Sequence, residues 1–147
     1  MKTWFRIVTG GLAAVALVPA LAFAQAPADG AAAATTAAEE DSRPLIVKVH
    51  ADWCAKCKAI APTWTRIENE FADEARVVVL DVTDEKRATE AKRLAGELGI
   101  AEFFAEFRAK TGTVAIFEPG ASEPARVLVA EKDFAAYQDA LGEIAAT

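Results

Sequence analysis

The chain has 147 residues, of which 53% are hydrophobic, and a formal net charge of −6. This length suits one ordinary domain. The acidic balance argues against a nucleic-acid partner, because binding to phosphates depends on clustered lysine and arginine side chains, and the basic residues here are scattered.

The first 24 residues have the pattern of a secretory signal peptide. Lys2 and Arg6 form a basic start, residues 7–21 are almost entirely apolar, and Ala22-Phe23-Ala24 resembles a signal-peptidase site. We expect cleavage after Ala24 and a periplasmic or secreted protein. The alternative is an uncleaved membrane anchor over residues 7–21, but this run is shorter than the roughly 20 residues of a spanning helix.

Residues 25–43 are mostly Ala, Thr, Pro, Gly and acidic residues without apolar periodicity, which predicts a flexible linker. A folded domain is expected over residues 44–147. It begins with a strand at residues 45–50, rich in β-branched side chains. A helix follows over residues 54–71, because Ile60, Trp64, Ile67 and Phe71 are spaced to share one helical face.

A second buried strand is predicted at residues 76–82 and a charged helix at residues 85–98, which Gly99 would end. Residues 100–111 contain Phe103, Phe104 and Phe107 at helical spacing. We expect a short extra helix that packs on the core; an exposed docking surface for a client protein is the alternative.

Two short strands at residues 113–118 and 125–130 follow, separated by Pro119-Gly120, and Asp133 can cap a last helix. The expected order is strand, helix, strand, helix, strand, strand, helix. This order predicts an α/β domain with a mixed central sheet of about four strands, flanked by helices on both faces.

The chemistry of the chain is concentrated in its two cysteines, Cys54-Ala55-Lys56-Cys57, which follow Trp53 at the junction of the first strand and helix. A disulfide that closes so short a loop restrains the unfolded chain very little, so a purely structural bridge is a poor explanation. At a helix start, free N–H groups favour the thiolate of Cys54, and Lys56 and Lys58 add positive charge. Cys57, one turn further on, is placed to resolve a mixed disulfide.

The segment from Lys48 to Pro62 resembles the active-site segment of thioredoxins, and the order of elements over residues 44–147 is similar to the thioredoxin fold. The resemblance implies a protein-disulfide oxidoreductase with Cys54 as the attacking and Cys57 as the resolving residue. It implies client proteins with cysteine pairs, no dissociable cofactor and a monomer. A reductant in an oxidising compartment would also need a donor such as a membrane thiol electron carrier.

Three positions depart from the family. Lys48 replaces the buried Asp that many thioredoxins carry five residues before the Trp, and His50 is expected on the same strand face. A desolvated Lys48 could act as a base, or stay charged against Asp81 or another acid. We expect instead that Lys48 extends to solvent and that His50 is a packed, hydrogen-bonded ring.

The other departures are Ala55-Lys56, where thioredoxins carry Gly-Pro, and Gly112, which falls where the family places a cis-proline. The first leaves the direction of electron flow open. The second predicts loss of the cis geometry, because a cis bond before a residue other than proline is unfavourable. Two non-enzymatic alternatives remain: an adaptor that docks through the Phe-rich segment, or a copper-binding module that uses both thiolates, with His50 as an optional third ligand.

Overall fold

The computed structural model describes residues 42–146. The predicted signal peptide and all but the last two residues of the predicted linker therefore lie outside the described residues. Within the described part of the chain, no helix is both long enough and apolar enough to cross a membrane.

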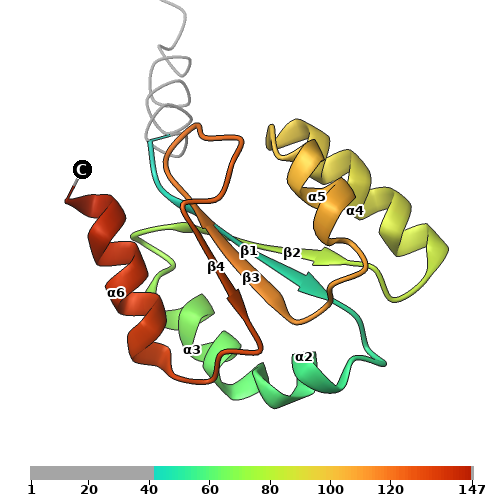
Figure 1. The fold of residues 1–147 in the computed structure, drawn as a ribbon, viewed down its shortest axis with the longest axis horizontal. Coiled ribbons are helices and arrows are strands. Elements are labelled where there is room, and N and C mark those ends of the chain that lie inside the picture. Colours follow the sequence, from blue (N-terminus) through green and yellow to red (C-terminus); the bar gives the residue numbers. More distant parts are fainter. Residues whose placement is uncertain (1–41, 147) are drawn as a thin grey trace, which may run out of the picture.

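A four-stranded mixed sheet forms the centre of the domain, in the order β2-β1-β3-β4 (Figure 1). The first strand, β1 (Leu45–His50), runs parallel to β2 (Arg76–Asp81) and antiparallel to β3 (Thr113–Phe117). The last strand, β4 (Arg126–Val129), pairs antiparallel with β3. Because β1 lies between two strands, most of its residues are buried. The segment with the two cysteines follows the carboxyl end of β1 directly.

Helices cover both faces of this sheet, as predicted (Figure 1). On one face, α3 (Ala61–Glu70) and α6 (Phe134–Ala145) pack over the sheet, with Trp64 and Tyr137 in the core. On the other face, α4 (Glu85–Glu97) and α5 (Ala101–Phe107) enclose a second core. The predicted fold class is confirmed.

The predicted helix over residues 54–71 is in fact two helices, α2 (Ala55–Ala59) and α3, with Ile60 between them. Ile60 has φ −96° and ψ 0°, outside the α-helical range. Pro62 lies in the first turn of α3, where its missing N–H cannot continue the hydrogen bonds of α2. The apolar spacing predicted the buried face correctly, but it could not show this break.

The extra helix predicted from the phenylalanines is α5. Phe103 and Phe104 are buried, and Phe107 packs against the same core. The ring of Phe103 lies 4.7 Å from that of Phe107 and 5.2 Å from that of Phe117 on β3, centroid to centroid. The aromatic residues therefore build the core beneath α5, and the exposed docking surface considered as an alternative is not formed by these rings.

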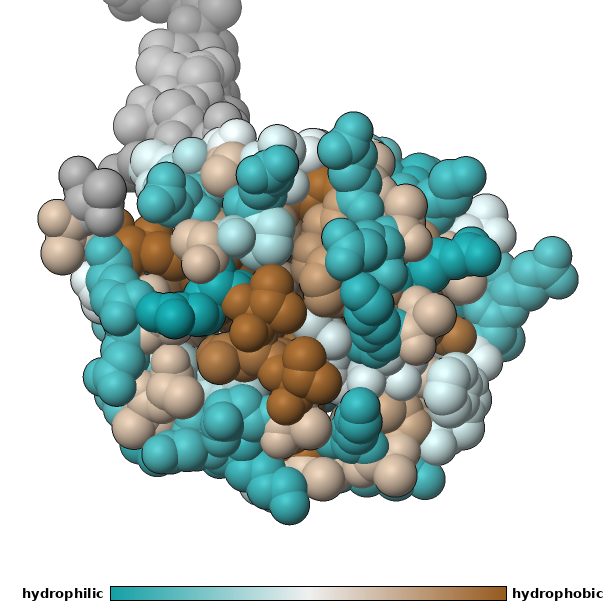
Figure 2. Space-filling view, viewed as in Figure 1, coloured by the Kyte–Doolittle hydropathy of each residue, from teal (hydrophilic) through white to brown (hydrophobic). Residues whose placement is uncertain are grey.

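Hydrophilic side chains cover much of the face drawn in Figure 2. Figure 2 shows a small group of hydrophobic side chains near the centre of this face, where β4 lies in Figure 1. Val129 on β4 is 53% exposed, and the large exposed hydrophobics of the described residues also include Val79 and Trp53. Of these, Trp53 adjoins the two cysteines.

Candidate active site

Cys54 is the N-cap of α2, and this position fixes its sulfur. After β1 the chain turns through buried Ala51, whose carbonyl oxygen accepts a hydrogen bond from the backbone N–H of Cys54, at 3.1 Å. Cys54 has an extended backbone, with φ −79° and ψ 113°, and its Sγ accepts the backbone N–H of Cys57 at 3.1 Å. An N-cap side chain normally supplies this acceptor through an oxygen, and here a sulfur does so.

Cys57 lies one turn further into α2 and is more deeply buried. Its side chain is 1% exposed, against 5% for Cys54, and the two thiols are not bridged. The Cys57 sulfur lies 3.8 Å from the carbonyl oxygen of Val49, to which its S–H can donate only a weak hydrogen bond. The thiol of Cys54 is therefore the one more accessible to solvent and to a reacting molecule.

The surroundings shift the pKa values of the two thiols in opposite directions. Burial opposes ionisation of Cys54, but hydrogen bonds from the Cys57 thiol and the Thr111 hydroxyl outweigh it. Together with the backbone amides of Cys57 and Lys56, these donors hold the pKa of Cys54 below its ordinary value. For Cys57, burial and the hydrogen bond that its thiol donates to Cys54 raise the pKa. Of the two sulfurs, Cys54 is thus the one that ionises more readily to the thiolate, which is the nucleophile in disulfide exchange.

Gly112 lies against α2, at the position where the family has a cis-proline. It has φ +82°, its N–H donates to Val49 O and its carbonyl oxygen accepts Ala130 N–H, both at 2.9 Å. A Cβ at this residue would lie 2.6 Å from the Cβ of Lys56. Residues 42–146 contain no cis peptide bond, so the predicted loss of that geometry is confirmed. The close approach brings neighbouring Thr111 to the Cys54 sulfur.

Trp53 is 64% exposed beside Cys54, and its indole Nε1 donates to the carbonyl oxygen of Thr83 at 3.1 Å. The backbone N–H of Asp52 donates to the hydroxyl oxygen of the same threonine at 3.0 Å. Thr83 is itself held by Asp81, whose Oδ1 accepts the threonine backbone N–H at 2.8 Å. The loop after β2 thereby orients the loop that carries the dithiol.

Arg87 closes this network from α4. Its Nη1 lies 2.9 Å from Oδ2 of Asp52 and 3.3 Å from Oδ2 of Asp81. A hydrogen bond from Arg87, followed by one from His50, lowers the pKa of the Asp52 carboxyl, which is exposed to solvent. Exposed ion pairs contribute little to stability, so the network orients the loop more than it stabilises the fold.

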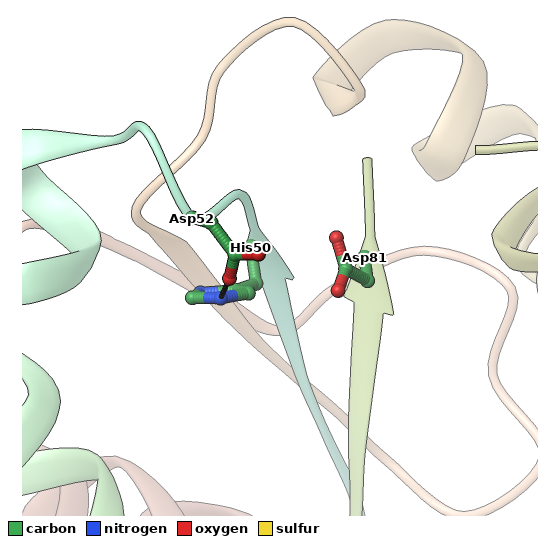
Figure 3. A group of neighbouring side chains, drawn as sticks. All are labelled: His50, Asp52 and Asp81. Atoms are coloured by element: carbon green, nitrogen blue, oxygen red, sulfur yellow. Dashed lines mark hydrogen bonds and ion pairs between the residues drawn. The ribbon is translucent and has the colours of Figure 1, made fainter. Parts of the chain in front are cut away.

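His50 belongs to this acidic cluster (Figure 3). Its Nε2 lies 3.2 Å from Oδ1 of Asp52, and Asp81 follows on the adjacent strand, opposite His50 in register. The expected hydrogen-bonded ring is therefore found at one nitrogen; buried Nδ1 has no hydrogen-bond partner among the described residues.

Within residues 42–146, His50, Asp52 and Asp81 are the one group of at least three potential ligands whose atoms lie within 4.8 Å of one another. Arg87 already pairs with both of its carboxylates, so the group is a charge-compensated network. The three-ligand copper site of Cys54, Cys57 and His50 does not form, because His50 joins the carboxylates instead of the two thiols.

Lys48 does not extend to solvent, and that expectation was wrong. The residue is 5% exposed, because β1 is an interior strand and α3 covers this face of it. Its Nζ lies 4.9 Å from the centroid of the Trp64 ring. Asp81, the partner considered from the sequence, pairs with Arg87. Lys56 and Lys58, by contrast, are exposed, so their charges are screened by solvent.

Thr83, Thr111 and Arg87 belong to this site but were not predicted from the sequence. Thr111 immediately precedes Gly112, so the signal was adjacency to a position already singled out. Arg87 lies 35 residues from Asp52, and only the packing of α4 near the end of β2 brings them together. No local pattern indicates that pair.

Replacing Gly112 with alanine should lower the free energy of unfolding by more than the strain of a left-handed backbone alone accounts for. The variant Gly120→Ala is the matched control, because Gly120 also has positive φ, +73°, but open space around it. The control should lose about 1–2 kcal/mol of unfolding free energy, for the left-handed backbone. Gly112→Ala should lose about 1–3 kcal/mol more, for overpacking against Lys56, in urea unfolding. Equal losses in the two variants would contradict the close packing.

Removing the Thr111 hydroxyl should make Cys54 less reactive. In Thr111→Val the thiolate loses a donor, so the pKa of Cys54 should rise toward its ordinary value. Loss of a hydrogen bond worth about 1.4 kcal/mol lowers the thiolate population about tenfold. At a pH below both values, alkylation by iodoacetamide should slow about tenfold, since only the thiolate reacts. The control is Thr65→Val on the exposed side of α3. An unchanged pH profile in Thr111→Val would show that the hydroxyl does not stabilise the thiolate.

Comparison with known proteins agrees with this geometry. The profile of the family Thioredoxin matches residues 28–107. Thioredoxin C-2 of Corynebacterium nephridii is 48% identical over 40 residues, which are 27% of this chain and 37% of that protein. The thiol:disulfide interchange protein TxlA homolog of Synechocystis is 33% identical over 89 residues, 60% of this chain and 47% of that protein. The chain thus spans less than half the length of either relative.

Solved structures with a similar fold include chloroplastic thioredoxin z, with 24% identity, a TM-score of 0.49, and coverage of 80% of this chain and 91% of that one. A second is Trxlp from Edwardsiella tarda, with 23% identity, a TM-score of 0.48, and coverage of 74% and 91%. The family profile covers more than half of the chain, including both cysteines, and the chain therefore belongs to the thioredoxin family.

Proposed function

We propose that this protein is a thiol-disulfide oxidoreductase that exchanges electrons with cysteine pairs of other proteins through Cys54 and Cys57. The observation that carries the proposal is the inequality of two adjacent thiols. Cys54 is favoured as thiolate at the start of α2, and Cys57 is kept as a buried thiol one turn away. Such a pair suits sequential attack and release.

In the reducing direction, the Cys54 thiolate attacks one sulfur of the client disulfide and forms a mixed disulfide, and the other client sulfur leaves as thiolate. Cys57 then loses its proton and attacks Cys54, which releases the first client sulfur. Two electrons pass from the two protein sulfurs to the two client sulfurs. The oxidising direction is the same sequence in reverse.

The names of relatives support this class of reaction. The Synechocystis relative is called a thiol:disulfide interchange protein, and another relative, tigA of Aspergillus niger, is called a protein disulfide-isomerase. From these names we infer for this chain only that it exchanges electrons with protein dithiols.

We further propose that the chain is exported and acts as a monomer in the periplasm or outside the cell. Support comes from the basic start at Lys2 and Arg6, the apolar run over residues 7–21 and the Ala22-Phe23-Ala24 pattern. An exported reductant requires a source of electrons, and a membrane thiol carrier would supply them across the bilayer.

The exchange mechanism predicts a distinct result for each cysteine variant with the aromatic disulfide DTNB. Reduced wild type should release two thionitrobenzoate ions per chain, because Cys57 displaces the one first bound to Cys54. Cys57→Ser should release one and keep the other covalently bound, as seen by mass spectrometry. Cys54→Ser should react slowly, because Cys57 is buried and its pKa is raised.

Insulin in place of DTNB tests a protein substrate. With excess dithiothreitol, wild type should accelerate its reduction, and Cys54→Ser should not. Two results with DTNB would contradict the proposed order of the two cysteines. One is that Cys54→Ser reacts as fast as Cys57→Ser, and the other is that wild type retains a bound thionitrobenzoate.

The export proposal is tested by expressing the full chain in a bacterium with a periplasm. The fractionated protein should begin at Gln25 by N-terminal sequencing and should have the mass of a single chain by light scattering. Residues 1–24 still attached to protein in the membrane fraction would favour an uncleaved anchor instead.

A further inference from the structure

Lys48 is a buried cationic residue with no carboxylate partner. Lysines are almost never fully buried without one. Here the side chain is 5% exposed, and no ion pair joins it to a carboxylate in the described part of the chain. The nearest strand neighbours are apolar, Val79 on β2 and Val114 on β3. The residue therefore introduces a charge into the core beneath the dithiol.

The indole of Trp64 gives this charge a place in the core. The Lys48 Nζ lies 4.9 Å from the ring centroid, within the range in which a cation is attracted to an aromatic face. The indole Nε1 of Trp64 donates to Oε1 of Glu68 at 2.6 Å. The Glu68 carboxylate therefore holds the ring at its Nε1 and adds negative charge that acts on Lys48. This arrangement favours an ammonium over a neutral amine at Lys48.

The remaining ionisable groups that face Lys48 are the two cysteines. Burial lowers the pKa of Lys48, and negative charge on Cys57, Glu68 and Cys54 opposes that effect. Reciprocally, Lys48 favours ionisation of Cys57. The Cys57 sulfur also contacts the carbonyl oxygen of Val49, the next residue of the strand. In a low-dielectric interior such charge interactions are much stronger than in water.

We propose that Lys48 is the internal counter-charge of the Cys54/Cys57 couple and makes its disulfide more oxidising than a neutral residue would. The proposal rests on the proposed function. When a partner dithiol reduces the disulfide, the partner loses two electrons and two protons and becomes a disulfide. The electrons go to Cys54 and Cys57, one proton goes to Cys57 and the other to solvent. The net charge gained is one thiolate, which a buried cation stabilises.

The test compares Lys48→Met with Lys58→Met by equilibration with glutathione. Lys58 follows Cys57 directly but is exposed, so it matches the charge change without the burial. Lys48→Met should lower the equilibrium constant for reduction by glutathione at least tenfold, which corresponds to about 30 mV of potential. Lys58→Met should stay within twofold of wild type. A change of less than twofold in folded Lys48→Met would overturn the proposal.

Lys48→Gln is a second neutral variant, and we expect the same decrease of at least tenfold in its equilibrium constant for reduction by glutathione. Dithiothreitol separates the two claims. A wild-type couple that dithiothreitol fails to reduce would refute the proposed function, whereas a couple that it reduces, with equal glutathione equilibria in wild type and Lys48→Met, would refute only the role of Lys48.

Discussion

The hydrogen bond from the Cys57 backbone N–H to the Cys54 sulfur is the interaction on which the rest of the site depends. It makes Cys54 the N-cap of α2, and so places a polarisable sulfur where a free backbone donor needs an acceptor. Because α2 has only five residues, the effect is local. Hydrogen bonds from the side chains of Cys57 and Thr111, followed by those from the amides of Cys57 and Lys56, lower the pKa of the thiol against the effect of burial.

A second constraint holds the other side of the dithiol. Gly112 leaves no room for a side chain against α2, and its backbone is bonded to both Val49 on β1 and Ala130 at the end of β4. The sheet therefore fixes the position of Thr111, whose hydroxyl adds a donor to Cys54. Reactivity at one sulfur thus depends on residues from three separate parts of the chain.

Much of this could be predicted from the sequence. The strands, the charged helix α4 and the aromatic helix α5 follow from apolar spacing, and the cysteine spacing indicates the chemistry. The break at Ile60 was missed because the apolar face continues through it, and Pro62 is compatible with the first turn of a helix.

Other features depend on tertiary contacts that no local pattern encodes. Lys48 has the sequence context of a strand that alternates apolar and ionisable residues, which suggests a solvated face. Its burial follows from the central position of β1 and from Trp64 above it. His50 and Asp81 meet because β1 and β2 are adjacent and in register, and Arg87 reaches both carboxylates of the cluster from α4.

The central claim is that the surroundings shift the pKa values of the two thiols in opposite directions, downward for Cys54 and upward for Cys57. The most direct measurement is a pH titration of the reduced protein with ¹³Cβ-labelled cysteine, followed by NMR and assigned with Cys57→Ser. The account predicts that Cys54 titrates below the ordinary cysteine pKa and Cys57 above it. Two thiols that titrate together in the ordinary range, or with Cys57 ionising first, would contradict it.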